Sequence, residues 1–134
     1  MAKAGDAYIV TLKKSHLEWG IHRYTSTRNP RYGEGYIPIY AKYAREYEVV
    51  NSNGTDRQNV LGKNIFNCTS SEGYFEGVLK AQGCRKAGDP YAKQFSGNKN
   101  LRALGEWFAM VNAEVGDTVE VRWTSETDIV FTKL

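Results

Sequence analysis

The clearest fold signal lies near the end of the chain. Thr118–Trp123 alternates polar and apolar residues with a period of two, which is typical of a strand with one buried face. Val115–Asp117 precedes it as a turn, and Asp128–Lys133 follows after a polar turn with a second strand-like composition. These two runs predict that the C-terminal part of the chain belongs to a β-sheet.

Shorter strand signals occur earlier in the chain. Tyr8–Leu12 is rich in β-branched residues and predicts a first strand. Ile65–Thr69 and Tyr74–Leu79 predict two strands that the turn-forming Ser70–Gly73 joins as a hairpin. Tyr36–Ile39 is typical of a short extended piece.

Two segments have helical periodicity. Ile39–Tyr47 places apolar residues at intervals of four, and Leu101–Val111 places them at intervals of three and four, after the candidate cap Asn100. We expect the core to include the inward-facing residues of the second helix and of the strand Thr118–Trp123. They are Trp107, Phe108, Val119, Val121 and Trp123.

Two long stretches, Ser15–Gly35 and Gln82–Asn98, contain several Gly and Pro residues and are predicted to be irregular, apart from a short turn around His16–Trp19. The order of elements therefore predicts a mainly β fold with two short helices. Many short strands between polar turns suit a small open barrel better than a parallel α/β sheet. The 134 residues fit one domain.

Positive charge is concentrated in two segments. Residues 20–33 hold Arg23, Arg28 and Arg31 and no acid, which gives +3. Residues 80–99 carry +4, from Lys80, Arg85, Lys86, Lys93 and Lys99 against Asp89. Because the whole chain has a net charge of +3, all other residues together carry −4. This asymmetry favours a polyanionic partner, although two solvated basic loops would give the same count.

We call residues 20–33 the first arm and residues 82–99 the second arm. Both combine cations with Asn, Ser, Thr or Gln, which contact phosphates and base edges in DNA grooves. The candidate DNA-binding residues of the first arm are Arg23, Tyr24, Ser26, Thr27, Arg28, Asn29 and Arg31. Those of the second arm are Arg85, Lys86, Lys93, Gln94, Ser96, Asn98 and Lys99.

The sequence has no Gly-x-Ser-x-Gly nucleophile motif and no Walker-type phosphate loop. Glu72, Glu76 and Lys80 are spaced by four, which fits either an ordinary solvent-exposed strand face or, with Asp128, a metal-dependent nuclease site. Cys84 has basic neighbours that would lower its pKa, but no base that would activate it. We predict no catalytic residue, no metal and no cofactor.

No run is long and apolar enough to span a membrane, and the polar Met1–Asp6 is not followed by a signal-peptide stretch. We therefore expect a cytoplasmic protein. In a reducing compartment, Cys68 and Cys84 are expected to be free thiols, and their spacing does not fit a zinc site.

Two stretches resemble a known family. In Ile37–Ala44 an Ile-Pro step leads into a short Ala/Tyr-rich helix, and the helix with Trp107 and Phe108 is followed by Val115–Val121 and a last strand. This arrangement is similar to the DNA-binding pseudobarrel family, which includes the plant "B-three" transcription-factor domain and the effector domains of some bacterial restriction endonucleases. The resemblance covers residues 8–134, and the long first arm is closer to the bacterial branch.

The resemblance implies a seven-stranded open barrel with two short helices, which grips the DNA major groove with two arms. By position, these arms would fall within residues 20–33 and 82–99, the segments that the charge count selects independently. The resemblance also implies a role in transcription regulation, or in a restriction system beside a separate catalytic nuclease chain.

We therefore expect residues 1–134 to form one domain, monomeric or weakly oligomeric, that binds double-stranded DNA sequence-specifically and catalyses nothing by itself. Three alternatives stay open. One is a compact metal-dependent nuclease, and another is a protein-interaction module. The third is a swapped-hairpin regulator of the antitoxin type, whose repeat unit is much shorter than this chain.

Overall fold

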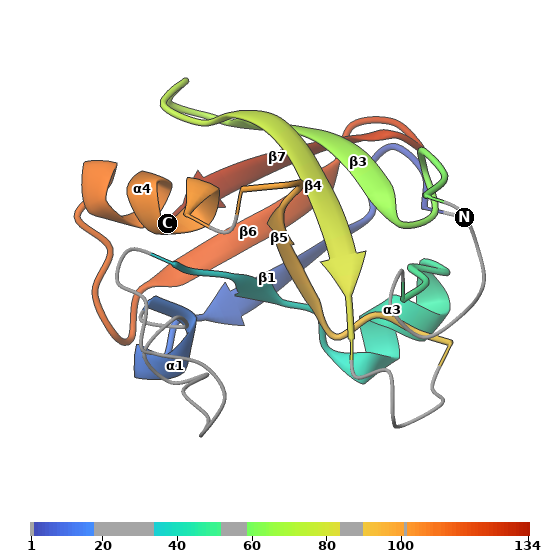
Figure 1. Ribbon diagram of the computed structural model, residues 1–134, viewed down its shortest axis with the longest axis horizontal. Coiled ribbons are helices and arrows are strands. Elements are labelled where there is room, and N and C mark those ends of the chain that lie inside the picture. Colours follow the sequence, from blue (N-terminus) through green and yellow to red (C-terminus); the bar gives the residue numbers. More distant parts are fainter. Residues whose placement is uncertain (1, 18–33, 52–58, 84–89, 101) are drawn as a thin grey trace.

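The computed structural model describes residues 2–17, 34–51, 59–83, 90–100 and 102–134, which form seven strands and three short helices (Figure 1). The strands are β1 (Ala7–Thr11), β2 (Ile37–Pro38), β3 (Ile65–Ser70), β4 (Glu76–Gln82), β5 (Gln94–Gly97), β6 (Thr118–Trp123) and β7 (Asp128–Lys133). The helices are α1 (Lys14–Leu17), α3 (Ala41–Glu46) and α4 (Ala103–Met110).

The strands form one sheet in the order β1-β6-β7-β3-β4-β5-β2. Neighbouring strands are antiparallel except β3 and β7, which run parallel with Cys68 opposite Ile129. The sheet curls until its edge strands β1 and β2 face each other without pairing, which leaves a nearly closed barrel with one open seam (Figure 1). The predicted mainly β fold, a seven-stranded open barrel, is therefore confirmed.

Hydrogen bonds between described residues connect the two sides of the seam. The Tyr8 hydroxyl on β1 donates to the Pro38 carbonyl on β2 over 2.9 Å. The Tyr36 N–H, directly before β2, donates to the His16 carbonyl in α1 over 3.1 Å. Because these contacts are not a strand ladder, packing in the interior must hold the two edges together.

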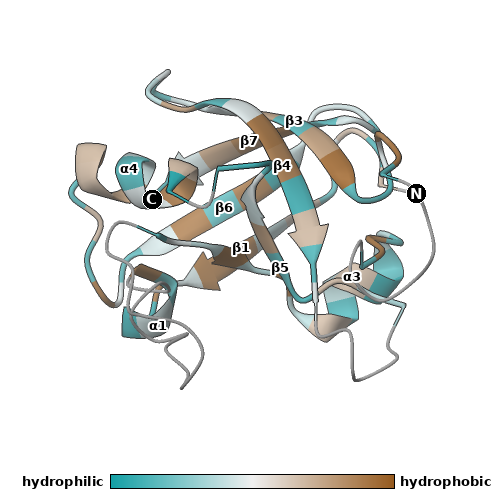
Figure 2. Cartoon of the chain, viewed as in Figure 1, coloured by the Kyte–Doolittle hydropathy of each residue, from teal (hydrophilic) through white to brown (hydrophobic). Residues whose placement is uncertain are grey.

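Aromatic side chains fill the interior of the barrel. Trp123 on β6 is fully buried, and its ring centre lies 5.9 Å from that of Phe66 on β3 and 6.3 Å from that of Phe95 on β5. All five residues predicted for the core are buried, so that prediction is confirmed. Along β6, hydrophobic and hydrophilic residues alternate, as expected when one face of a strand lines the core (Figure 2).

Helices α3 and α4 lie at opposite ends of the molecule's long axis (Figure 1). Ile39 and Tyr47, which flank α3, are buried, and the Tyr47 hydroxyl donates to the Ala7 carbonyl over 3.0 Å. On α4, the indole N–H of Trp107 donates to Oε1 of Glu72 in the β3–β4 turn over 2.6 Å. Each helix is thus fixed to the barrel by buried side chains and a hydrogen bond.

The clearest departures from the sequence predictions concern β5, α1 and the start of β4. Strand β5 lies within Gln82–Asn98, which was predicted to be irregular, because its single large apolar side chain, Phe95, is too little to show a period. Pairing with β4 and β2 stabilises this strand. α1 is a third helix where only a turn was predicted, and β4 begins at Glu76 rather than Tyr74 because the hairpin turn extends that far.

Replacing Tyr8 with Phe should lower the free energy of unfolding by about 1 kcal/mol, since it removes the hydroxyl that bridges the seam and keeps the buried ring. Urea unfolding monitored by tryptophan fluorescence measures this change. Tyr40→Phe is the matched control, because Tyr40 belongs to the same aromatic cluster but is 41% exposed. Equal stability of the two variants would contradict the role of the bridge.

His16 in α1 is buried just before the first arm. Its Nδ1 accepts a hydrogen bond from the Lys13 N–H over 3.0 Å, and its ring meets Tyr36 edge-on with centres 5.0 Å apart. Burial, and to a smaller extent the charge of Lys13, lowers the pKa of the His16 imidazole below its ordinary value. Protonation of Nδ1 would remove the acceptor of this hydrogen bond.

We expect the free energy of unfolding to fall as the pH decreases from the ordinary histidine pKa of about 6.5 towards the lower folded-state pKa. Over this range the unfolded chain binds a proton that folded His16 does not. His16→Asn keeps an acceptor and should lose this part of the pH dependence. Urea unfolding from about pH 5 to 8 tests it. Identical pH profiles for the two proteins would show that His16 does not titrate in this way.

Candidate nucleic-acid interface

The first arm lies between β1 and β2. On its two sides the structure describes Leu17, the last residue of α1, and the buried Glu34. All candidate residues of the first arm lie outside the described residues. They are Arg23, Tyr24, Ser26, Thr27, Arg28, Asn29 and Arg31.

The second arm runs from the end of β4 through β5. Two of its candidates, Arg85 and Lys86, lie outside the described residues. Lys93 precedes β5 and Lys99 follows it, and both are exposed, which suits contact with a large ligand. The half-buried candidates are Gln94 and Asn98.

Ser96 differs from the other described candidates because it is fully buried. Its hydroxyl lies 3.2 Å from Oε1 of Gln82 on β4, to which it donates a hydrogen bond. In this conformation Ser96 fixes the side chain of Gln82 and does not itself reach the surface.

The strand register places β2, the strand that follows the first arm, beside β5 of the second arm. β2 directly follows the first arm and pairs with β5, with Ile37 opposite Phe95 and Pro38 opposite Gln94. β5 also pairs with β4, where Gln82 lies opposite Gln94. The strand after the first arm and the strands of the second arm, β2, β5 and β4, are therefore neighbours in the sheet. In Figure 1, α1 lies on the lower side of the molecule, and so do the ends of these strands near α3.

Lys80, Gln82 and Gln94 are half-buried polar side chains on the face of β4 and β5 that points away from the core, and the fully buried Ser96 lies between them. Lys80 pairs with Ser96 and Gln82 with Gln94, and directly opposite residues of an antiparallel pair face the same side. The alternate residues Ala81 and Phe95 face the core and are fully buried. Lysine suits phosphate oxygens and glutamine suits base edges, so these polar side chains have the chemistry of a groove-reading surface.

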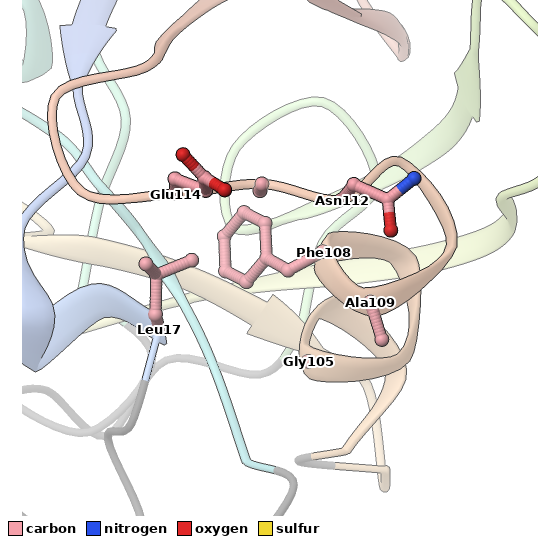
Figure 3. Close-up of a pocket in the computed structure, with 7 residues that line it drawn as sticks. Leu17, Gly105, Phe108, Ala109, Asn112 and Glu114 are labelled. Carbon is pink, nitrogen blue, oxygen red and sulfur yellow. The ribbon is translucent and has the colours of Figure 1, made fainter.

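Three hollows in the described part of the chain differ in charge. The first, of about 480 Å³, lies between Leu17 and α4, where Phe108 points towards Leu17 and the loop that carries Glu114 (Figure 3). The second, of about 360 Å³ along β3 and β7, includes Asp128. Both have a carboxylate and no cation among their lining residues.

The third hollow, of about 280 Å³, has the opposite charge. We call it the Arg45–Lys93 cleft, because these two cations line it and no carboxylate does. It lies where the start of α3 meets the chain that enters β5, and so at the base of the second arm.

The acids of the alternative nuclease site are not gathered in the structure. Glu72 accepts the hydrogen bond from Trp107, Asp128 accepts one from Asn67 over 3.0 Å, and Glu76 is an exposed residue of β4. Within the described ranges, no group of three or more His, Cys, Asp or Glu side chains could hold a metal ion.

The expectations of free cysteine thiols and of no membrane-spanning segment can be compared with the described residues. Cys68 is a free, buried thiol, and burial raises its pKa well above the ordinary value, so it has little thiolate character. Cys84 lies outside the described residues. Among the described helices, none has the length and apolar character needed to cross a membrane.

Comparisons with protein-family models, with curated proteins and with solved structures found no match. The likeness to the pseudobarrel family therefore stands on the sequence motifs.

Sequence reasoning missed Arg45 as a candidate for the interface. It belongs to the helix predicted from Ile39–Tyr47, where a cation on the polar face is unremarkable. Its proximity to Lys93 comes from tertiary contacts, such as the 2.9 Å hydrogen bond from the Ile39 N–H to the Lys93 carbonyl. No periodicity or motif relates these two positions.

Proposed function

We propose that this chain is a double-stranded DNA-binding domain of the pseudobarrel type, which recognises a specific sequence by inserting its two arms into the major groove. It would serve a restriction system as the recognition module, beside a separate catalytic chain, or act as a small transcription regulator. The proposal assigns it no catalytic step.

The observation that carries the proposal is the pairing of β2 with β5. Two segments that are basic in sequence are joined to adjacent strands of one rigid sheet. Two basic loops at distant places on the barrel could not grip one groove, whereas loops on neighbouring strands can follow the same duplex. A major groove about 12 Å wide accepts such elements.

Different residue types in the arms would supply affinity and sequence specificity. The arginines and lysines of the arms neutralise phosphates, which supplies affinity and sets the register on the duplex. Asn29, Gln94 and Asn98 have amides that can pair with an adenine edge, and arginine can pair with guanine through two donors. The net charge of −4 outside residues 20–33 and 80–99 repels DNA and favours binding through the arms.

Fluorescence anisotropy with a labelled mixed-sequence duplex, recorded at several salt concentrations, tests this proposal. We expect wild-type affinity to fall steeply with salt, and the triple variant Arg23→Gln, Arg28→Gln, Arg31→Gln to lose about one unit of the log–log slope for each phosphate contact removed. Lys93→Gln tests the second arm in the same way.

The matched control removes three lysines that lie outside both arms, through Lys3→Gln, Lys63→Gln and Lys133→Gln. It lowers the net charge by the same amount and should change the slope less. If the control weakens binding as much as the arm variant, binding follows net charge and the two-arm model is wrong. Absence of wild-type binding at low salt rejects DNA as the partner and favours a protein partner.

A further inference from the structure

The Arg45–Lys93 cleft has walls that hydrogen bonds hold in place. Its lining residues are Ile39, Tyr40, Ala41, Arg45, Tyr91, Ala92 and Lys93. The Ile39 N–H donates to the Lys93 carbonyl over 2.9 Å, and the Ala92 N–H donates to the Val49 carbonyl over 3.0 Å. The two segments that form the cleft are therefore tied together on either side of α3, which preorganises the site.

The charge of the cleft is not neutralised by the described residues. Arg45 and Lys93 are both exposed, and no ion pair joins either of them to an acid in the described ranges. The lining contains no Asp or Glu. Two cations that share a cleft of about 280 Å³ repel each other, and an anion between them would remove that repulsion.

The rest of the lining suits a sugar more than a second charge. Ile39 and Ala92 are buried apolar residues of the lining, and Tyr40 and Tyr91 line the cleft beside them. A phosphodiester unit combines an anionic phosphate with an apolar deoxyribose, so it complements this mixture of cations, aliphatic groups and aromatic rings.

We propose that the Arg45–Lys93 cleft binds one backbone phosphodiester of the duplex that the arms hold. This inference rests on the proposed DNA-binding function and adds a site to it. Lys93 belongs to both the second arm and the cleft, so a DNA strand that contacts the second arm would pass next to the cleft. Arg45 would hold the phosphate, fixing the register of the second arm without reading a base.

The location of the cleft on the barrel, rather than at the tip of an arm, gives this contact a distinct role. A cation on a helix that is packed against the core loses less conformational freedom on binding than one on a loop. The cleft would therefore anchor the duplex at the base of the second arm, and binding there would be independent of base sequence.

The first test compares Arg45→Gln with Lys42→Gln on a mixed-sequence duplex. Lys42 lies on the same helix, with its ammonium 5.5 Å from the ring centre of Tyr43, and does not line the cleft. Both variants remove one exposed charge and should fold normally. We expect Arg45→Gln to weaken binding by roughly fivefold and to lower the salt slope by about one unit. Lys42→Gln should change both quantities much less, and Arg45→Lys should restore most of the loss.

The second test removes the charge from the DNA. A duplex enriched from a random pool is prepared with single neutral methylphosphonate linkages along each strand. A neutral linkage at one position should weaken binding of the wild-type protein. The same linkage should leave the affinity of Arg45→Gln unchanged, because this variant already lacks the side chain that would hold that phosphate.

The outcomes separate the two proposals. If wild-type protein binds the duplex but Arg45→Gln behaves like Lys42→Gln, or no neutral linkage couples to Arg45, the cleft is not a phosphate site and the two-arm function stands. If wild-type protein does not bind the duplex at all, both proposals fail.

Discussion

The packing of Trp123 is the interaction on which the rest of the structure depends. The centre of its ring lies 6.3 Å from that of Tyr8 on β1 and 5.3 Å from that of Tyr47 after α3. The ring also packs against Phe66 on β3 and Phe95 on β5. A single buried side chain thus touches both sides of a barrel whose edge strands do not pair. Among the residues that the structure describes, its buried indole N–H has no hydrogen-bond partner, and aromatic contacts surround the ring.

The candidate interface follows from this core. Because Phe95 points inward to Trp123, its neighbour Gln94 points outward, opposite Gln82 on one side and Pro38 on the other. Tyr47 holds the end of α3 against the same tryptophan, and α3 carries Arg45 towards Lys93. Rigid packing inside therefore sets the positions of the polar groups outside, which is what a sequence-specific binding surface requires.

The sequence predicted those parts of the fold that have a local signal. Thr118–Trp123 and Asp128–Lys133 are strands with the predicted bounds. The first alternates polar and apolar residues, and the second has a strand-like composition between polar turns. β5 has no comparable signal, because Gln94–Gly97 offers one large apolar side chain and is stabilised by pairing with β4, the preceding strand, and with β2, which lies far away in sequence. The parallel pairing of β3 with β7 is equally non-local.

The sequence predicted the candidate site only through the concentration of Arg and Lys in two segments. Residue types in the second arm identified Lys93 and Gln94, which are accessible, and Ser96, which is buried against Gln82. Composition does not distinguish these cases, since accessibility depends on which face of β5 a residue occupies. Arg45 could not be found from sequence, because its relation to Lys93 exists only after α3 packs against the chain that enters β5.

Selection from a randomised duplex pool at several salt concentrations, followed by sequencing of the retained DNA, tests sequence-specific recognition most directly. The two-arm model predicts an enriched motif, with retention that falls steeply as salt increases. Retention without any enriched motif would leave only non-specific charge attraction. No retention even at low salt would contradict DNA binding altogether.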